Sequence, residues 1–149
     1  MNTALIELFN RDLDRLKNEV AAYKSETVFW KVDCEIKNSG GNLTLHLIGN
    51  LNHFIGAIIG NSGFVRQREQ EFSDKNTPRH QLLEQLDEVK KTIEKAISPL
   101  SPSDFAQMYP VNIRKEGMTT QQFLMHLYGH LNYHLGQINY HRRLLDTCS

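Results

Sequence analysis

Four of the seven histidines in this 149-residue chain lie in one short segment, HLYGHLNYHLGQINYH, at positions 126, 130, 134 and 141. His130 and His134 are four residues apart, so on a helix their Cβ atoms would lie about 5–6 Å from each other. Metal–nitrogen bonds are about 2.0–2.1 Å long, and one helix can therefore present both imidazoles to a single ion. The spacing predicts a metal site on a C-terminal helix.

The two histidines also fall on the face of that helix that should enter the core. Helical periodicity places the following side chains on one stripe about 80° wide: Phe123, Leu127, His130, His134, Ile138 and His141. A buried neutral imidazole needs partners for both of its ring nitrogens. A bound metal meets that need, and hydrogen bonds within the protein core are the alternative.

A third ligand has to come from another helix, and His46 and His53 both lie on the flank of the core face of the second predicted helix. Three histidine ligands leave at least one coordination position open, which is typical of catalytic or substrate-binding metal sites rather than closed structural ones. No Asp or Glu falls on the core stripes nearby, so a carboxylate-rich di-iron site is not expected. His53 stays open as an alternative ligand, or as a residue that supports one.

The remaining histidines are expected outside the site. His126 lies about 60° round the helix from the midline of His130 and His134, and His141 lies near the helix end. Both are predicted to be peripheral, although a part for His126 in the site stays open. His80 falls in the first turn of the third predicted helix, where we expect exposure to solvent.

Four segments with helical periodicity must position these side chains. They are about Thr3–Lys24, Asn42–Asn61 with Asn42 as N-cap, Pro78 to about Ile97 with Thr77 as N-cap, and Thr119 to about Leu145. In the last segment, Thr119 and Gln122 should form a capping box, in which each side chain bonds the other's free backbone N–H. Four amphipathic helices predict an all-α four-helix bundle, with residues 1–149 as a single domain.

The connections are predicted from residues that interrupt helices. The NSGG stretch at 38–41 should break any helix, and the Ser- and Pro-rich stretch at 98–104 should end the third one. Residues 105–117 are interpreted as an extended crossover, with one short helical turn after Ser101.

The second predicted helix is apolar nearly all round. Opposite its main stripe lie Leu45, Ile48, Ile55 and Ile59. Such a helix is buried on more than one side, so it either runs through the centre of the bundle or packs against a second subunit. Gly49, Gly56 and Gly60 share a third strip, which indicates a close approach by a neighbouring helix or an accidental alignment.

Composition excludes several classes of function. Lys plus Arg equals Asp plus Glu at 17 each, so no bulk charge draws the chain to nucleic acid or to an anionic membrane. Arg142 and Arg143 are expected to complement a helix dipole.

Cys34 and Cys148 have no CxxC spacing, which argues against a disulfide framework or a cysteine zinc site. The sequence lacks a membrane-spanning run and a signal-peptide pattern, so we expect a cytoplasmic protein.

Two segments give the chain a family resemblance. LTLHLIGNLNHFI on the second predicted helix and HLYGHLNYHLGQINYHRRLL on the fourth resemble the DinB/YfiT-like superfamily of bacterial four-helix-bundle proteins. The resemblance implies a divalent metal, often nickel or zinc, and iron and manganese stay open as further options. It also implies one ligand from the second helix and an HxxxH pair from the fourth. By position these are His46, His130 and His134, and His46 is favoured over His53 because it occupies the early His-Leu position.

The resemblance also implies candidate activities. Some relatives are metal-dependent S-transferases that use a low-molecular-weight thiol, and an open metal position would lower the pKa of such a thiol. The leading hypothesis is a metal-dependent enzyme, either a thiol-dependent transferase or a hydrolase acting on a small molecule, and the alternative is a non-catalytic metal- or small-ligand-binding protein. The family tends to form homodimers, which would suit the apolar back of the second helix. No catalytic residue, cofactor-binding residue or general base is assigned.

Overall fold

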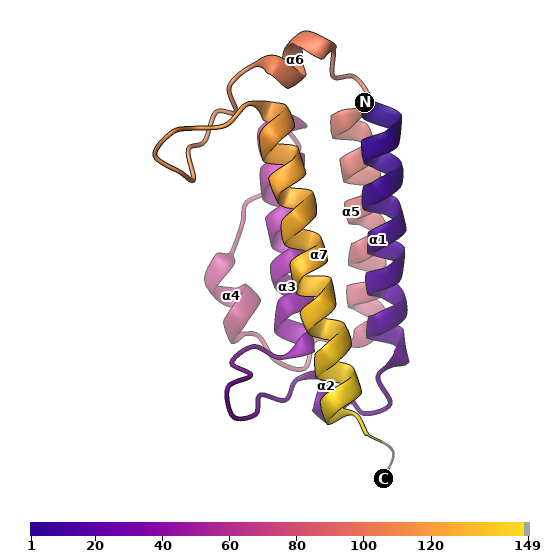
Figure 1. Cartoon of the computed structure of the whole chain (residues 1–149). Helices are drawn as coiled ribbons and strands as arrows, with labels where there is room; N and C mark the ends of the chain where they lie inside the picture. Colours follow the sequence, from indigo (N-terminus) through magenta and orange to yellow (C-terminus); the bar gives the residue numbers. More distant parts are fainter. Residues whose placement is uncertain (148–149) are drawn as a thin grey trace.

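The computed structural model describes residues 1–147, which are all-helical (Figure 1). The elements are α1 (Asn2–Ala22), α2 (Glu26–Phe29), α3 (Gly40–Leu51), the π-helix η1 (Asn52–Ile59), α4 (Arg68–Ser73), α5 (Arg79–Ile97), α6 (Pro102–Ala106) and α7 (Thr120–Leu145). Within residues 1–147 no β-strand forms, and the β-type pairing is confined to two isolated bridges, Asp33–Ile36 and Met108–Thr119. No helix in this part of the chain is both long and apolar enough to cross a membrane.

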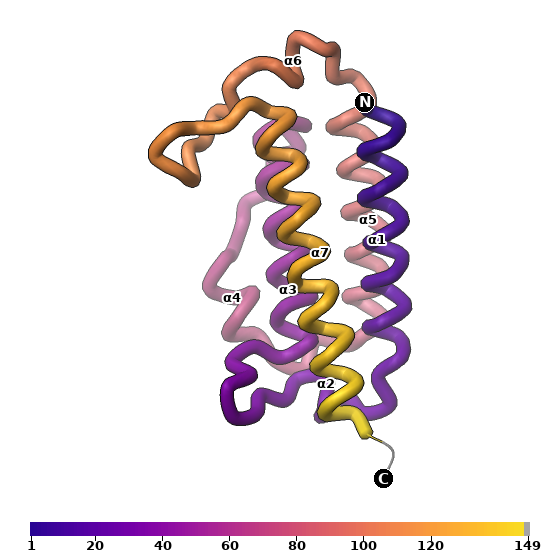
Figure 2. Tube along the Cα trace, viewed as in Figure 1, coloured from indigo at the N-terminus to yellow at the C-terminus, as the bar shows by residue number. Residues whose placement is uncertain are grey.

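The long helices α1, α5 and α7 and the α3–η1 segment pack side by side around one core, as the ribbon and the Cα trace show (Figures 1 and 2). α3 and α7 run in opposite directions and contact each other. The predicted apolar stripes of the four packed segments contribute side chains to this core. The largest fully buried ones include Phe9, Leu13, Leu47, Leu86, Ile93 and Phe123. Each such burial stabilises the fold by about 1.5–3 kcal/mol.

Two of the predicted local structures are confirmed. The hydroxyl of Thr119 accepts from the backbone N–H of Gln122 at 3.2 Å, and the N–H of Thr119 donates to the Gln122 side chain at 2.9 Å, which is the predicted capping box at the start of α7. The helical turn after Ser101 is α6, capped in the same way by Ser101 and Asp104.

Two predicted helix starts are wrong. α3 begins at Gly40 with Ser39 as its cap, so the NSGG stretch starts this helix instead of breaking one. A Cβ on Gly40 would lie 2.4 Å from the Tyr23 hydroxyl, and one on Gly41 would lie 2.5 Å from the Trp30 ring. Tertiary packing therefore needs glycine inside this helix. α5 begins at Arg79 after Pro78, with no side-chain cap from its N-cap residue, and Thr77 lies outside it.

The predicted continuous second helix also changes character, because its last part is the π-helix η1. Three glycines on this segment contact neighbours closely, as the sequence pattern indicated. An added Cβ would come within 1.9 Å of Glu71 at Gly49, 2.7 Å of Thr92 at Gly56 and 3.0 Å of Ala96 at Gly60. The neighbours belong to α4 and α5, so close approach within one chain accounts for the strip.

The sequence pattern did not predict α2 and α4. α4 packs against α3 and covers part of its apolar back. On that apolar surface Ile48 and Ile55 are buried within the chain and Leu45 and Ile59 are partly buried, and packing against a second subunit stays a prediction. Cys34 is an exposed free thiol, and Cys148 lies outside the described residues.

Candidate metal centre

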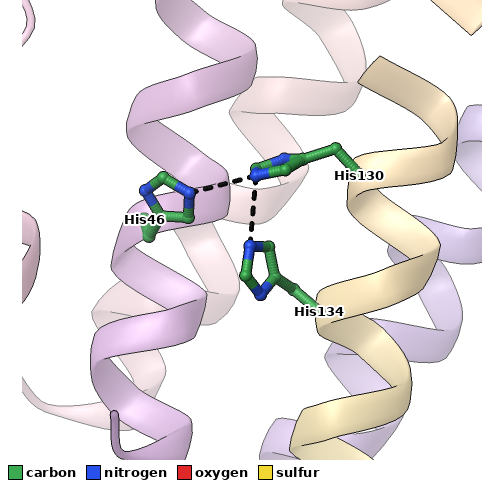
Figure 3. Close-up of side chains that lie close together, drawn as sticks. All are labelled: His46, His130 and His134. Carbon is green, nitrogen blue, oxygen red and sulfur yellow. Dashed lines mark hydrogen bonds between the residues drawn. The ribbon is translucent and has the colours of Figure 1, made fainter. Parts of the chain in front are cut away.

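Three imidazoles converge between α3 and α7 (Figure 3). The Nε2 atom of His130 lies 3.2 Å from Nε2 of His46 and 3.1 Å from Nε2 of His134. One ring nitrogen from each of the three histidines lies within 4.8 Å of the others, a group that could hold a metal ion. His46 is buried, whereas His130 and His134 are half-buried. The structure therefore brings together the three residues predicted as ligands.

A carboxylate sets the orientation of His46. Oε1 of Glu71 lies 3.0 Å from Nδ1 of His46, and Arg66 donates to both oxygens of Glu71 at 2.8 Å. Burial acts to raise the pKa of Glu71, but hydrogen bonds from His46 and Arg66 outweigh it and hold this pKa below its ordinary value. An ionised Glu71 can only accept, so it places the His46 proton on Nδ1. The Nε2 lone pair of His46 then faces the centre, as metal binding requires.

His134 is oriented in the same way by Gln137. Its Nδ1 lies 2.7 Å from the side-chain oxygen of Gln137, one turn further along α7. Since that oxygen accepts, the His134 proton also lies on Nδ1, and the Nε2 lone pair faces His130. Two of the three rings are thus held in the tautomer that binds a metal.

Burial keeps the α7 pair uncharged near neutral pH. Burial, together with the neighbouring histidines, lowers the pKa of His130 to about 4. Burial also lowers the pKa of His134, against a raising hydrogen bond from Gln137. Because a protonated imidazole cannot be a ligand, lowered pKa values favour metal binding at neutral pH.

Glu71 and Arg66 were missed by the sequence analysis. No acidic residue was expected beside the histidines, because the long helical stripes carry none there. Glu71 instead comes from α4, a six-residue helix without a long apolar repeat. The Gly49 position was the available signal, since an interior glycine beside a predicted ligand marks space for another group.

The other histidines lie outside the cluster. His53 and His126 are half-buried beside Phe54 and Phe123, with ring centroids 4.7 and 5.9 Å apart respectively. His80 is exposed, as predicted. His141 also lies outside the cluster, as predicted, and is buried with partners for both of its ring nitrogens.

The partners of His141 explain its burial. Its Nδ1 lies 2.7 Å from the Tyr23 hydroxyl, and its Nε2 lies 2.8 Å from the Lys31 carbonyl oxygen. His141 thus matches the alternative offered for the whole stripe, a core histidine satisfied by protein groups. His130 does not, because its Nδ1 is buried without a partner.

One protein family matches nearly the whole chain. A family described as "Protein of unknown function (DUF1572)" matches residues 3–148. The chain belongs to this family. No curated protein matches the chain significantly. The matched range contains every residue of the three-histidine cluster and its Glu71, Arg66 and Gln137 partners.

In this DUF1572 chain, Gly49→Ala is expected to weaken metal binding. The added Cβ would lie 1.9 Å from Oε2 of Glu71, so the carboxylate has to move away from His46. Loss of a partner that orients a ligand typically weakens metal affinity about 10–100-fold. Competition titration of zinc against a chromophoric chelator measures the change. Gly129→Ala is the matched control, because an added Cβ there meets open space. Equal zinc affinities for the two variants would contradict the prediction.

Proposed function

We propose that the chain is a DinB/YfiT-like four-helix-bundle enzyme that binds one divalent transition metal through His46, His130 and His134. The observation that carries the proposal is the convergence of one ring nitrogen from each of the three histidines, all within 4.8 Å of one another. The acceptors on Nδ1 of His46 and His134 support it further. Neutral imidazole ligands suit zinc and nickel best, with iron or manganese as further candidates.

The residues around the centre support a role in catalysis. When bound, the metal lowers the pKa of a coordinated thiol or water and so supplies a nucleophile near neutral pH. Glu71 and Gln137 hold two of the rings in place. Gln137 also lines a neighbouring pocket of about 420 Å³, together with Leu43, Tyr140 and Leu144. That volume suits a small molecule, and the pocket walls combine apolar side chains with polar and charged ones.

These contacts favour a thiol-dependent S-transferase over a hydrolase. Glu71 is already bonded to both His46 and Arg66, so it is not available as a general base for water. A thiol with a lowered pKa needs no such base. Its sulfur would form a bond to the electrophilic carbon, the bond to the leaving group would break with the electron pair, and the thiol proton would pass to solvent.

The test compares turnover of metal-loaded variants. Glutathione or bacillithiol is paired with monochlorobimane, and thioether formation is followed by fluorescence. We expect wild type and His126→Ala to react well above background, and His134→Ala to fall to background because it loses a ligand. Background rates for all three proteins, with metal bound in wild type, would contradict an enzyme for these substrates. They would favour the alternative, a non-catalytic metal- or small-ligand-binding protein.

We further propose a homodimer that forms through an exposed face of α7. Met125, Tyr133, Tyr140 and Leu144 are all exposed, and Gly129 and Gly136 on the same face meet open space. A contiguous patch of exposed large apolar side chains is typical of a protein–protein interaction site. Sedimentation equilibrium tests this, and a monomeric wild type at high concentration would contradict it.

A cytoplasmic location is also proposed, in keeping with the free thiol of Cys34, and cell fractionation tests it.

A further inference from the structure

The three histidines of the cluster differ in what holds them. Nδ1 of His46 faces Glu71 and Nδ1 of His134 faces Gln137, at 3.0 and 2.7 Å. Nδ1 of His130 is buried and has no hydrogen-bond partner. In Figure 3 this nitrogen faces away from the other two rings, and only Nε2 of His130 turns toward them. The central ligand is thus the one without an orienting group.

A second buried polar atom without a partner lies on the facing helix. Asn50 is 6% exposed, and its side-chain oxygen Oδ1 has no hydrogen-bond partner. Asn50 is four residues after His46, so the two side chains share a face of α3 one turn apart. α3 and α7 run in opposite directions. Because the helices are antiparallel, a step from His46 to Asn50 along α3 runs in the direction from His134 to His130 along α7. Asn50 is therefore displaced from His46 toward the level of His130 and away from that of His134.

The chemistry of the two atoms is complementary once a metal is bound. Without metal, Nε2 of His130 faces the lone pairs of both His46 and His134, so its own proton belongs on Nε2. A metal bound at Nε2 requires that proton to lie on Nδ1 instead. The buried Nδ1–H then needs an acceptor, and a buried amide oxygen is a suitable one.

We propose that Asn50 is a positioning residue for the metal site, whose Oδ1 accepts a hydrogen bond from Nδ1–H of His130 in the metal-bound state. The inference rests on the proposed function, because it assumes that a metal binds here. Asn50 completes a set in which each ligand has its own acceptor: Glu71 for His46, Asn50 for His130 and Gln137 for His134. Because the acceptor is needed only in one tautomer of His130, Asn50 favours the metal-bound state selectively.

Zinc affinity tests the proposal directly. Competition titration is performed on wild type, Asn50→Leu, which removes the acceptor, and Asn50→Asp, which keeps one. Asn10→Leu is the matched control, since Asn10 also has a buried side-chain oxygen without a partner but lies on α1, outside the cluster. We expect Asn50→Leu to weaken zinc binding about 10–100-fold. Asn50→Asp and Asn10→Leu should stay close to wild type.

Nitrogen-15 NMR of the histidine rings supplies a readout that a purely structural role would not change. Zinc should give a slowly exchanging Nδ1–H on His130 in wild type and in Asn50→Asp, and a rapidly exchanging one in Asn50→Leu. Asn50→Ala replaces Asn50→Leu if the latter does not fold. Unchanged affinity and exchange in the apolar variant would overturn the inference, as would equal weakening in Asn50→Asp. Failure of wild type to bind zinc at all would instead overturn the proposed function.

Discussion

Purified wild-type protein is expected to hold about one equivalent of divalent metal per chain, and His130→Ala to hold almost none. His130 is the central ring of the cluster, with its Nε2 next to Nε2 of both His46 and His134. Its removal leaves two imidazoles on different helices, which is too few ligands for a stable site. Elemental mass spectrometry on untagged protein measures the content and identifies the ion.

The control for this experiment is His126→Ala, which removes a histidine from the same helix but outside the cluster. It should retain its metal. Metal should also raise the melting temperature of wild type, because a ligand present at about 1,000 times its Kd stabilises the native state by about 4 kcal/mol. Equal metal content in wild type and His130→Ala would contradict a metal site in which His130 is a ligand. If neither wild type nor His130→Ala contained metal, the three residues would be ordinary core histidines.

Asp12→Ala is expected to lower the free energy of unfolding by about 2–3 kcal/mol at pH 7. The Asp12 side chain is fully buried between α1 and α7. It accepts from Arg11 at 2.9 and 3.0 Å, from Arg15 at 2.9 Å and from the Tyr128 hydroxyl. The arginines are half-exposed, so they regain water when Asp12 is removed. The expected loss therefore lies below that for breaking a fully buried ion pair.

The same carboxylate gives this prediction a pH dependence. Burial acts to raise the pKa of Asp12, but hydrogen bonds from Arg11 and Tyr128 outweigh it and lower this pKa from 3.8 to about 2. A folded-state pKa below the unfolded value means that the stabilisation is complete above about pH 4 and is lost as pH falls through about 2. Wild type and Asp12→Ala should therefore converge in stability at strongly acidic pH.

Urea unfolding followed by circular dichroism measures both effects. The matched control is Asp14→Ala, on the same helix, which removes an exposed pair with Lys90. Such surface pairs contribute about 0–1 kcal/mol. If Asp12→Ala cost no more than Asp14→Ala, Asp12 would not be the link that holds α7 against α1.

Short-range features of the sequence were sufficient for the long helices. The apolar stripes of α1, α5 and α7 and the Thr119–Gln122 capping box depend on residues three or four positions apart, which sequence spacing reports directly. The pairing of His130 with His134 on one helix face is of the same kind. For these elements, local periodicity and the buried face coincide.

The short helices α2 and α4, which carry no such signal, could not be predicted in this way. α2 has four residues and α4 has six, and helices of that length are not stable without packing, because forming the first turn costs more than it returns. The chain holds them against α7 and α3 respectively. Gly40 and Gly41 were misread for the same reason, since what they contact is Tyr23 and Trp30, far away in sequence.

The amino-acid sequence by itself determined which side chains could meet at a metal site: an HxxxH pair on one helix and two candidate histidines on another. Only the tertiary structure decided the rest, because the register between two antiparallel helices is a long-range property. That register brings His46, and not His53, to the pair. The packing of α4 on α3, likewise a long-range contact, places Glu71 against the open side of Gly49 and bonds it to His46. The orientation of the ligands thus depends on contacts between segments that no local pattern relates.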